Sequence, residues 1–360
     1  MSSASAAASA PRDPLGTQFL AEIREQPEAL ARLVEAADAF EAVAAAIRGR
    51  GATTIRMVGH GSSDNAASYG VYAFGLLPRW TALRDSISLT VYYGADLDMS
   101  GCTVLALSQS GRTPDVVQYV EIARRRGAFT VAITNDPGSE LATAAEAVLP
   151  LSAGPERAVA ATKTYTNQVA ALGLLAACSA GRGASFAQEL RVARDAMAEL
   201  IPSLEQRIAS VAIPFAFAGR MFVIGRGLEF ATVREIALKL LETCRVAAEP
   251  LTATDLAHGP VAALDPLFPV WAIAADDETL PAVLEAAARA REAGATVIAS
   301  GSAAAAVSGA SYALPVPRSS PLLTPLLSVV PGQLFAWALA RAKGLDPDEP
   351  RGLSKVTLAR

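Results

Sequence analysis

Short apolar runs alternate along the chain with longer segments whose apolar residues recur at helical spacing. The run Thr103–Leu107, for example, ends in small polar residues, and a helical pattern begins shortly after them. This alternation predicts parallel strands joined by amphipathic helices. We therefore expect an α/β fold, with helices on both faces of a parallel sheet and ligands bound at the carboxyl ends of the strands.

The same pattern is repeated in the second half of the chain. Residues 54–61 read TIRMVGHG and residues 220–227 read RMFVIGRG, so their glycines align at an offset of 166 residues. At this offset the apolar run 104–107 also aligns with 270–273. A repeat of this length is far longer than a solenoid unit and indicates an internal duplication. We expect two tandem doubly wound parallel-sheet domains.

We predict five segments in chain order. They are a disordered Ser/Ala-rich tail at 1–14, a helical segment at 15–48, the first domain at 49–200, the second domain at 201–345 and a C-terminal tail at 346–360. The N-terminal tail lacks the charged and apolar regions of a signal peptide. The linker between the two copies is expected to be helical, with Pro202 inside it.

Composition and charge exclude several classes of protein. The net charge is −4 and the charged residues are scattered, which is unlike the basic stripe of a nucleic-acid-binding protein. The longest apolar run, 169–178, is too short to span a bilayer. The three cysteines are far apart, and we interpret them as core thiols in a reducing compartment. These features predict a cytoplasmic protein that binds neither membrane nor nucleic acid.

Polar residues that can hold a phosphate follow two strands of the first copy. They are Ser62, Ser63, Ser108, Gln109, Ser110 and Thr113. Hydroxyls, backbone N–H groups and the dipole of a helix N-terminus together suit a phosphate group. In the second copy the positions that match the second stretch include Ala274 and Ala275, so we assign phosphate binding to the first copy. The alternative is helix capping, but two caps do not need five hydroxyls.

Four further side chains are candidates for acid–base chemistry or for structure. Only His60 and His258 are histidines, and both lie in loops beside glycine. We expect His258 to transfer a proton, whereas His60 could be a ligand contact or a turn residue. Lys239 and Glu242 share one helix face with Glu235 at i, i+4 and i+7. That face could be solvated, but the place of Glu242 shortly before the histidine loop favours a general base.

Two lysines have ordinary structural explanations. Lys163 lies in the polar stretch 156–164 and could be an exposed lysine at a helix start. Lys355 lies near the end of the chain, where a lysine is normally exposed and inert. With two histidines in separate loops, the sequence offers no metal-ligand cluster, and we expect neither a metal nor an organic cofactor.

These motifs together resemble the sugar isomerase (SIS) family over nearly the whole chain from Leu15. The greatest similarity is to the isomerase half of glucosamine-6-phosphate synthase and to the stand-alone glucosamine-6-phosphate deaminases related to it. The motifs that carry the resemblance are GSS at 61–63, SQSGRT at 108–113, TNDPGS at 134–139, ATK at 161–163, ALKLLE at 237–242, HGP at 258–260 and LSKVT at 353–357.

The resemblance implies roles for particular residues. The six polar residues named above match positions that hold the sugar phosphate. Val159 and Ala161 match sugar-contacting positions, although the synthases have a serine where Ala161 stands. Glu242 matches the base that moves a proton between C1 and C2. His258 matches the ring-opening histidine, which relatives take from the neighbouring subunit of a homodimer.

Two lysines gain a role only from the resemblance. Lys355 matches a tail lysine that forms a Schiff base with the ketose, and Lys239 matches a second lysine near the sugar. The synthases begin with a glutaminase domain whose nucleophile is an N-terminal cysteine, whereas the first cysteine here is Cys102. We therefore expect this chain not to release ammonia from glutamine.

The expected activity is conversion of glucosamine 6-phosphate, a phosphorylated amino sugar, to fructose 6-phosphate and ammonia. The expected assembly is a homodimer with shared active sites. Two other enzyme activities remain open, a plain aldose–ketose isomerase and an enzyme that cleaves a fructosamine phosphate. A sugar-phosphate sensor without turnover is an alternative from another class. Such a sensor needs only the phosphate-binding residues, not Glu242, His258 and Lys355.

Overall fold

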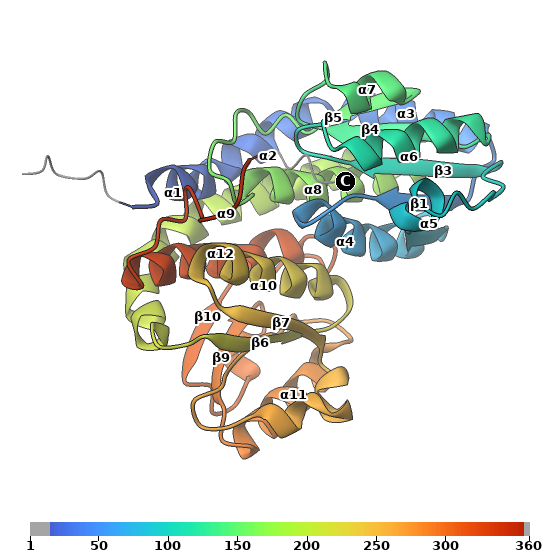
Figure 1. Ribbon diagram of the computed structural model, residues 1–360. Coiled ribbons are helices and arrows are strands. Elements are labelled where there is room, and N and C mark those ends of the chain that lie inside the picture. Colours follow the sequence, from blue (N-terminus) through green and yellow to red (C-terminus); the bar gives the residue numbers. More distant parts are fainter. Residues whose placement is uncertain (1–14, 356–360) are drawn as a thin grey trace, which may run out of the picture.

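The computed structural model describes residues 15–355 and contains two five-stranded parallel sheets. The predicted tail at 1–14 lies outside the described residues, as do residues 356–360, which include Val356 and Thr357 of the LSKVT motif. Figure 1 shows the two sheets in separate layers, one above the other. This arrangement confirms the predicted α/β fold with two parallel sheets.

Each sheet contains five consecutive strands of the chain. The strands of the first sheet are β1 (Thr54–Val58), β2 (Thr81–Arg84), β3 (Cys102–Leu107), β4 (Phe129–Thr134) and β5 (Ala147–Pro150). The strands of the second sheet are β6 (Arg220–Gly225), β7 (Ala247–Thr252), β8 (Pro269–Ile273), β9 (Thr296–Gly301) and β10 (Tyr312–Pro315). Every pair of neighbouring strands is parallel.

The strand order confirms the duplication. The first sheet has the order β2-β1-β3-β4-β5 and the second the order β10-β9-β8-β6-β7, which is the same order read from the opposite edge. In such an order the chain leaves β1 toward one edge and β3 toward the other. The loops that follow these two strands therefore meet at the carboxyl edge, where the sequence has its glycine-rich and hydroxyl-rich turns.

Helices cover both faces of each sheet, and three further helices precede the first sheet in the chain. The leading helices are α1 (Thr17–Arg24), α2 (Gln26–Glu35) and α3 (Ala37–Gly49). The first domain adds α4 (Ser62–Leu76), α5 (Ile87–Val91), α6 (Pro114–Arg125), α7 (Glu140–Ala144) and α8 (Lys163–Ser179). The linker is α9 (Gly183–Ala212), and the second domain adds α10 (Phe230–Cys244), α11 (Leu280–Glu292) and α12 (Thr324–Ala342). Five short 3-10 helices, η1 to η5, lie between these elements.

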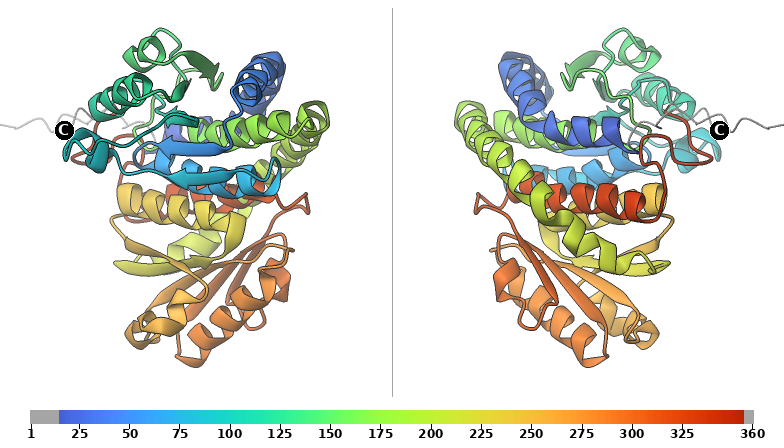
Figure 2. Two further views of the ribbon diagram at one scale, coloured as in Figure 1. Left: turned by 90° about the vertical axis from the view of Figure 1, so that its right-hand side faces the viewer. Right: turned by 90° about the vertical axis from the view of Figure 1, so that its left-hand side faces the viewer.

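The inner helices join the two domains. Figure 2 shows α10 (yellow) and α12 (red) between the two sheets, and α10 packs against α4 of the first domain. Helix α8 is buried along its whole length, which explains why its sequence from Val169 to Cys178 is apolar on every face. The predicted helical linker is present as α9, with Pro202 inside it. No helix among residues 15–355 is both long enough and apolar enough to span a membrane.

The C-terminal tail is attached to the first helix of the chain. The carboxylate of Asp348 accepts hydrogen bonds from the backbone N–H groups of Gln18 (3.0 Å) and Phe19 (2.7 Å). These are N–H groups of the first turn of α1, which have no partner within the helix, so Asp348 takes the place of a capping residue. This contact across more than 300 residues holds the tail against the protein and directs it toward the first domain.

The three cysteines are unpaired, but they are not equally buried. Cys178 and Cys244 lie in the core, as predicted, whereas Cys102 is partly exposed at the start of β3. The prediction of three core thiols is therefore wrong for Cys102. It is the one residue of β3 that is not buried.

Candidate functional site

Of the six residues predicted to hold a phosphate, which we call the cradle, four lie in the loop that follows β3: Ser108, Gln109, Ser110 and Thr113. Ser108 Oγ accepts a hydrogen bond from the backbone N–H of Gly111 (3.1 Å) and lies 3.1 Å from Thr113 Oγ1. Gly111 has φ +64°, and a Cβ atom there would overlap the side chain of Ser139. Only glycine allows this tight turn without strain. The turn brings the hydroxyls of the loop to the N-terminus of α6.

A cavity of about 560 Å³ opens at this loop. Its lining residues are His60, Gly61, Ser63, Tyr92, Leu107, Ser108, Gln109, Ser110, Thr113, Asp115 and Lys355. Five of the six predicted cradle residues therefore lie around one cavity, together with the predicted tail lysine. The exception is Ser62, whose hydroxyl donates instead to Glu235 Oε1 (2.9 Å) of the second domain.

Helix capping does not account for these hydroxyls. The N-cap residue of α4 is Gly61 and that of α6 is Thr113, and neither makes a side-chain cap hydrogen bond. Ser63 Oγ accepts a hydrogen bond from Gln168 Nε2 of α8 (3.0 Å). The cradle hydroxyls are thus held by their neighbours at the cavity and are not used to cap the helices that follow.

A buried cluster of charges lies beside the cradle. Lys239 Nζ lies 2.5 Å from Glu242 Oε2 and 3.4 Å from Glu235 Oε1, and it donates to Ser62 Oγ (3.3 Å). Asn65 Nδ2 donates to the second oxygen of Glu235 (2.9 Å). The side chains of Glu235 and Lys239 are almost fully buried. The alternative interpretation, a solvated helix face, is therefore wrong, because α10 presents this face to α4.

The cluster fixes the charge of Lys239. Burial by itself disfavours an ammonium group, but the charges of Glu235 and Glu242 outweigh it and raise the pKa of Lys239. Burial raises the pKa of Glu235, and Lys239 and the hydrogen bond from Asn65 offset only part of that effect. The raised pKa favours the ammonium form of Lys239, which attracts negative charge and is not a base.

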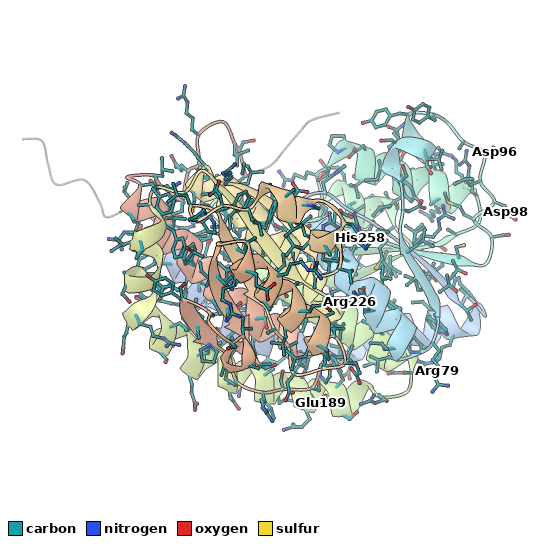
Figure 3. The ribbon with its side chains drawn as sticks, turned by 90° about the horizontal axis from the view of Figure 1, so that it is seen from below. Arg79, Asp96, Asp98, Glu189, Arg226 and His258 are labelled. Carbon is teal, nitrogen blue, oxygen red and sulfur yellow. The ribbon has the colours of Figure 1, made fainter. Side chains whose placement is uncertain are left out.

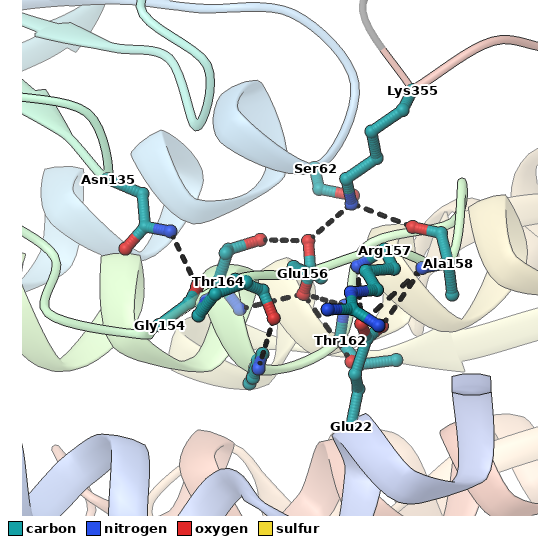
Figure 4. Close-up of polar contacts among 12 residues, drawn as sticks. Glu22, Ser62, Asn135, Gly154, Glu156, Arg157, Ala158, Thr162, Thr164 and Lys355 are labelled. Atoms are coloured by element: carbon teal, nitrogen blue, oxygen red, sulfur yellow. Dashed lines mark hydrogen bonds and ion pairs between the residues drawn. The ribbon is translucent and has the colours of Figure 1, made fainter.

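Lys355 reaches the same region from the C-terminal tail (Figure 4). Its Nζ donates to Glu156 Oε2 (2.7 Å) and to the carbonyl oxygen of Ala158 (2.7 Å). Glu156 also accepts from the N–H groups of Thr162 (3.0 Å) and Thr164 (3.1 Å). Burial alone would raise the pKa of Glu156, but the charge of Lys355 and these hydrogen bonds outweigh burial and lower it. The tail lysine is thus half-buried and paired, not exposed and inert.

Sequence reasoning missed several polar residues around this segment. Glu22 of α1 accepts from the N–H groups of Arg157 and Ala158, and burial raises its pKa to about 7. Lys163 is fully buried and donates to Glu25 (2.6 Å), so its interpretation as an exposed lysine is wrong. The polar composition of 156–164 is a usable signal, but the partners are Glu22 of α1 and Glu25 between α1 and α2, more than 130 residues away.

Two predicted sugar contacts lie on the same segment as Glu156. The backbone N–H of Val159 donates to the carbonyl oxygen of Asp348 (3.0 Å), and both Val159 and Ala161 are partly exposed. The tail therefore runs along the segment that carries them.

Glu242 lines a separate cavity of about 490 Å³. Most of the other residues around this cavity come from the end of α10 and from the tail between Gly344 and Leu353.

His258 is not part of this cluster. It ends the 3-10 helix η3 (Asp255–His258), which follows β7, and its side chain is exposed on the second domain (Figure 3). Within residues 15–355 no hydrogen bond or ion pair joins His258 to the cradle or to the charged cluster. In the same part of the chain, no group of three or more His, Cys, Asp or Glu side chains is arranged to hold a metal ion.

Comparison with known proteins gives one family. The SIS domain family matches residues 50–178 and 215–341. The glutamine–fructose-6-phosphate aminotransferase [isomerizing] of Leifsonia xyli is 36% identical over 324 residues, which cover 85% of this chain and 52% of that protein. The chain therefore spans about half the length of such curated relatives.

Two solved structures have the same architecture. The C-terminal domain of glucosamine-fructose-6-phosphate aminotransferase from Francisella tularensis has a TM-score of 0.86 at 26% identity, covering 95% of this chain and 100% of that one. Glucosamine-6-phosphate deaminase from Thermotoga maritima has a TM-score of 0.77 at 22% identity, covering 95% and 100%. At that identity the second similarity concerns the fold alone.

Proposed function

Because this chain belongs to the SIS domain family, we propose that it acts on a sugar phosphate as an isomerase, and that its reaction is the hydrolytic deamination of glucosamine 6-phosphate. The observation that carries the proposal is the contact between the two domains at Ser62. There Ser62 of the first domain contacts the buried Glu235 and Lys239 of the second, and Lys239 in turn pairs with the partly exposed Glu242. A site that only binds a phosphate has no need for this charged cluster.

The cradle holds the phosphate in this proposal. The hydroxyls of Ser108, Ser110 and Thr113 and the N-terminus of α6 supply hydrogen-bond donors and a favourable dipole for an anion. Fixing the phosphate orients the sugar chain so that its first carbons lie away from the cradle. Binding energy from a remote group of this kind can then be used to position the reacting carbons.

Glu242 transfers the proton in this proposal. Once His258 has opened the sugar ring, the Glu242 carboxylate removes the proton from C2 and returns it to C1. The electron pair of the C2–H bond moves through an enolamine, and the product carries an imine at C2. Lys239 stays an ammonium ion next to Glu242 and stabilises the negative charge that develops on the substrate oxygen.

Lys355 completes the reaction in this proposal. Its neutral amine attacks C2, a bond between C2 and Nζ forms, and ammonia leaves with the original C2–N bond. Water then hydrolyses the new imine, giving the C2 ketone of fructose 6-phosphate and regenerating the lysine. Before the attack the Lys355 ammonium group loses a proton to solvent, and Glu156, its ion-pair partner, holds the lysine in place until then.

The first experiment is an ammonia-release assay with glucosamine 6-phosphate. We expect ammonia and fructose 6-phosphate in equal amounts, with the ketose followed by a coupled enzyme. Plain isomerase activity would give a ketose from an aldose phosphate without ammonia. A fructosamine-phosphate enzyme would release an amine only from that substrate. Binding of sugar phosphates with no turnover of any of them would contradict the enzyme and favour a sensor.

We further propose a homodimer whose active sites take Glu242 from one chain and His258 from the other. The exposure of His258 and its separation from the cluster support this arrangement. A heterodimer of a Glu242→Gln chain with a His258→Asn chain then has one intact site and one site with both lesions. We expect the heterodimer, purified through two different tags, to have about half of the wild-type activity.

The two parental homodimers are the controls for this experiment, and both should be nearly inactive. If each site were built from a single chain, every site in the heterodimer would carry one lesion and no activity would return. Failure to isolate any doubly tagged dimer would contradict the proposed assembly itself.

A further inference from the structure

His60 lies at the cradle, although neither the motifs nor the proposed chemistry give it a role. It is the middle residue of the turn Gly59-His60-Gly61 between β1 and α4, and Gly61 has φ +55°. This turn directs the imidazole toward the first turn of α6. The ring lines the cavity of about 560 Å³ together with Ser108 and Thr113.

The partner of His60 is a carboxylate at the phosphate end of the cavity. Asp115 lies in the first turn of α6, directly after the cradle loop, and it lines the same cavity. Asp115 as a whole is only 8% exposed. Asp115 Oδ2 lies 2.8 Å from His60 Nε2, whereas Asp115 Oδ1 is buried without a hydrogen-bond partner among the described residues. Because an ionised carboxylate only accepts, His60 Nε2 donates this bond.

A carboxylate at this position conflicts with phosphate binding. Two negative groups that share a partly buried site repel each other more strongly than they would in water. The dipole of α6, which would otherwise favour the phosphate, already acts on Asp115 in its first turn. A sugar phosphate can use the cradle well only if the charge of Asp115 is balanced.

Among the residues that line the cavity, only His60 and Lys355 can carry a positive charge. Lys355 is paired with Glu156 (2.7 Å), a carboxylate that has no other cationic partner within residues 15–355. Arg112 of the cradle loop does not line this cavity and pairs with Asp136 (3.4 Å). This leaves His60 as the group in the cavity that can offset the charge of Asp115, through the 2.8 Å hydrogen bond that its ring makes to Oδ2.

We propose that His60 is a positioning residue that sets the affinity of this site for the phosphate group, by hydrogen bonding to Asp115 and offsetting its charge. This inference rests on the proposed function, because it concerns the same sugar-phosphate site. It assigns to His60 an effect on binding, exerted through Asp115, and not a step in proton transfer at the sugar carbons.

The test is a set of three variants: His60→Asn, Asp115→Asn and the double variant. His60→Asn leaves Asp115 charged and without its donor, so we expect the Kd for glucosamine 6-phosphate to rise about 5- to 20-fold. KM should rise by more than kcat falls. Asp115→Asn removes the charge, so the double variant should return to within about 3-fold of the wild-type Kd.

A purely structural role for His60 predicts a different pattern. In that case the double variant would bind no better than His60→Asn, because a second substitution does not repair a misplaced turn. An unchanged Kd in His60→Asn, or a loss confined to kcat, would also overturn the inference. Unfolding temperatures of all three variants show whether the turn remains folded.

Inorganic phosphate separates this inference from the proposed function. Its binding to the wild type and to the three variants, measured by calorimetry, depends on the cradle but not on the identity of the sugar. Suppose that His60→Asn binds phosphate more weakly than the wild type, that the double variant recovers, and that the wild type releases no ammonia from glucosamine 6-phosphate. The proposed reaction then fails and the role of His60 stands. If the wild type turns over the amino sugar and His60→Asn binds phosphate normally, the role of His60 fails alone.

Discussion

Replacing Glu242 by glutamine is expected to lower kcat for glucosamine 6-phosphate by about 10³-fold, with the Kd for the sugar phosphate within about 3-fold of wild type. Glutamine has the size of glutamate and retains an oxygen that can accept from Lys239 Nζ, which lies 2.5 Å from Glu242 in the wild type. It cannot take a proton from C2. The cradle that we propose as the phosphate site belongs to the other domain and is unchanged.

Proton exchange at C2 gives a readout that does not depend on ammonia release. With substrate deuterated at C2, the wild type should lose deuterium to water during turnover. Glu242 holds the abstracted deuterium before it is returned to C1, and in that interval it can exchange with water. Glu242→Gln should retain the deuterium. A variant that still exchanges the C2 proton at more than a tenth of the wild-type rate would show that another group is the base.

Glu235→Gln is the matched control for this prediction. It also removes a negative charge next to Lys239, at 3.4 Å. Glutamine keeps one of the two oxygens that accept hydrogen bonds from Ser62 and Asn65 and replaces the other with an amide nitrogen. We expect its kcat to stay within about tenfold of wild type, because Glu235 is fully buried and both of its oxygens already accept hydrogen bonds from Ser62 and Asn65. Equal losses in the two variants would mean that the charge of the cluster matters and the proton transfer by Glu242 does not.

The fold could be predicted from the sequence because the same alternation of apolar runs and amphipathic segments occurs twice. Strand β8 is buried throughout and β3 is buried from Thr103 onward, so both give apolar runs, and the helices that follow them, α6 and α11, give amphipathic patterns at the same offset. Each half therefore supports the interpretation of the other. The positions of the cradle residues followed from the fold, because parallel strands bring their carboxyl-end loops to one edge.

The contacts between the domains could not be predicted in this way. Periodicity shows that one face of α10 differs from the others, but it does not show which surface that face meets. In the structure it meets α4, so Glu235 and Lys239 are buried against Ser62 and Asn65 and are not solvated. Burial of a charged helix face depends on how two domains pack, and that packing leaves no short-range pattern in the sequence.

The position of Lys355 was beyond sequence reasoning for a similar reason. A lysine close to the end of a chain has no periodic context, and only the resemblance to the SIS family assigned it a role. Two long-range contacts bring it to the site: Asp348 binds the first turn of α1, and Glu156 binds the Lys355 ammonium. In each contact the two partners are about 200 residues or more apart in the sequence, so neither contact is visible as a local motif.

Replacing Lys355 by arginine is expected to lower turnover by about 10²-fold, equivalent to about 2.7 kcal/mol of transition-state stabilisation. Arginine keeps the positive charge beside Glu156 but cannot form an imine at C2. Borohydride reduction in the presence of fructose 6-phosphate should add the mass of the reduced sugar phosphate to the wild type and not to Lys355→Arg. Labelling of the variant to the same extent would place the imine on another lysine.

Replacing Lys355 by methionine separates the structural role of the ammonium group from its chemical role. Methionine leaves the Glu156 carboxylate buried without a cation, and we expect the free energy of unfolding at pH 8 to fall by about 1–3 kcal/mol. In the wild type the pKa of Glu156 is lowered, so its contribution to stability is present above the ordinary glutamate pKa and is lost as the pH falls.

In Lys355→Met the charge that lowers the Glu156 pKa is gone, and burial, which raises it, is left opposed only by hydrogen bonds. Protonating Glu156 then removes the unpaired buried charge of the variant. The difference in the free energy of unfolding between Lys355→Met and the wild type should therefore shrink as the pH falls from 8 to about 4.5. Urea unfolding of wild type, Lys355→Arg and Lys355→Met at both pH values measures this, with the arginine variant expected to follow the wild type. An equal deficit at both pH values would mean that Lys355 stabilises the tail by packing, and that its ion pair with Glu156 contributes little.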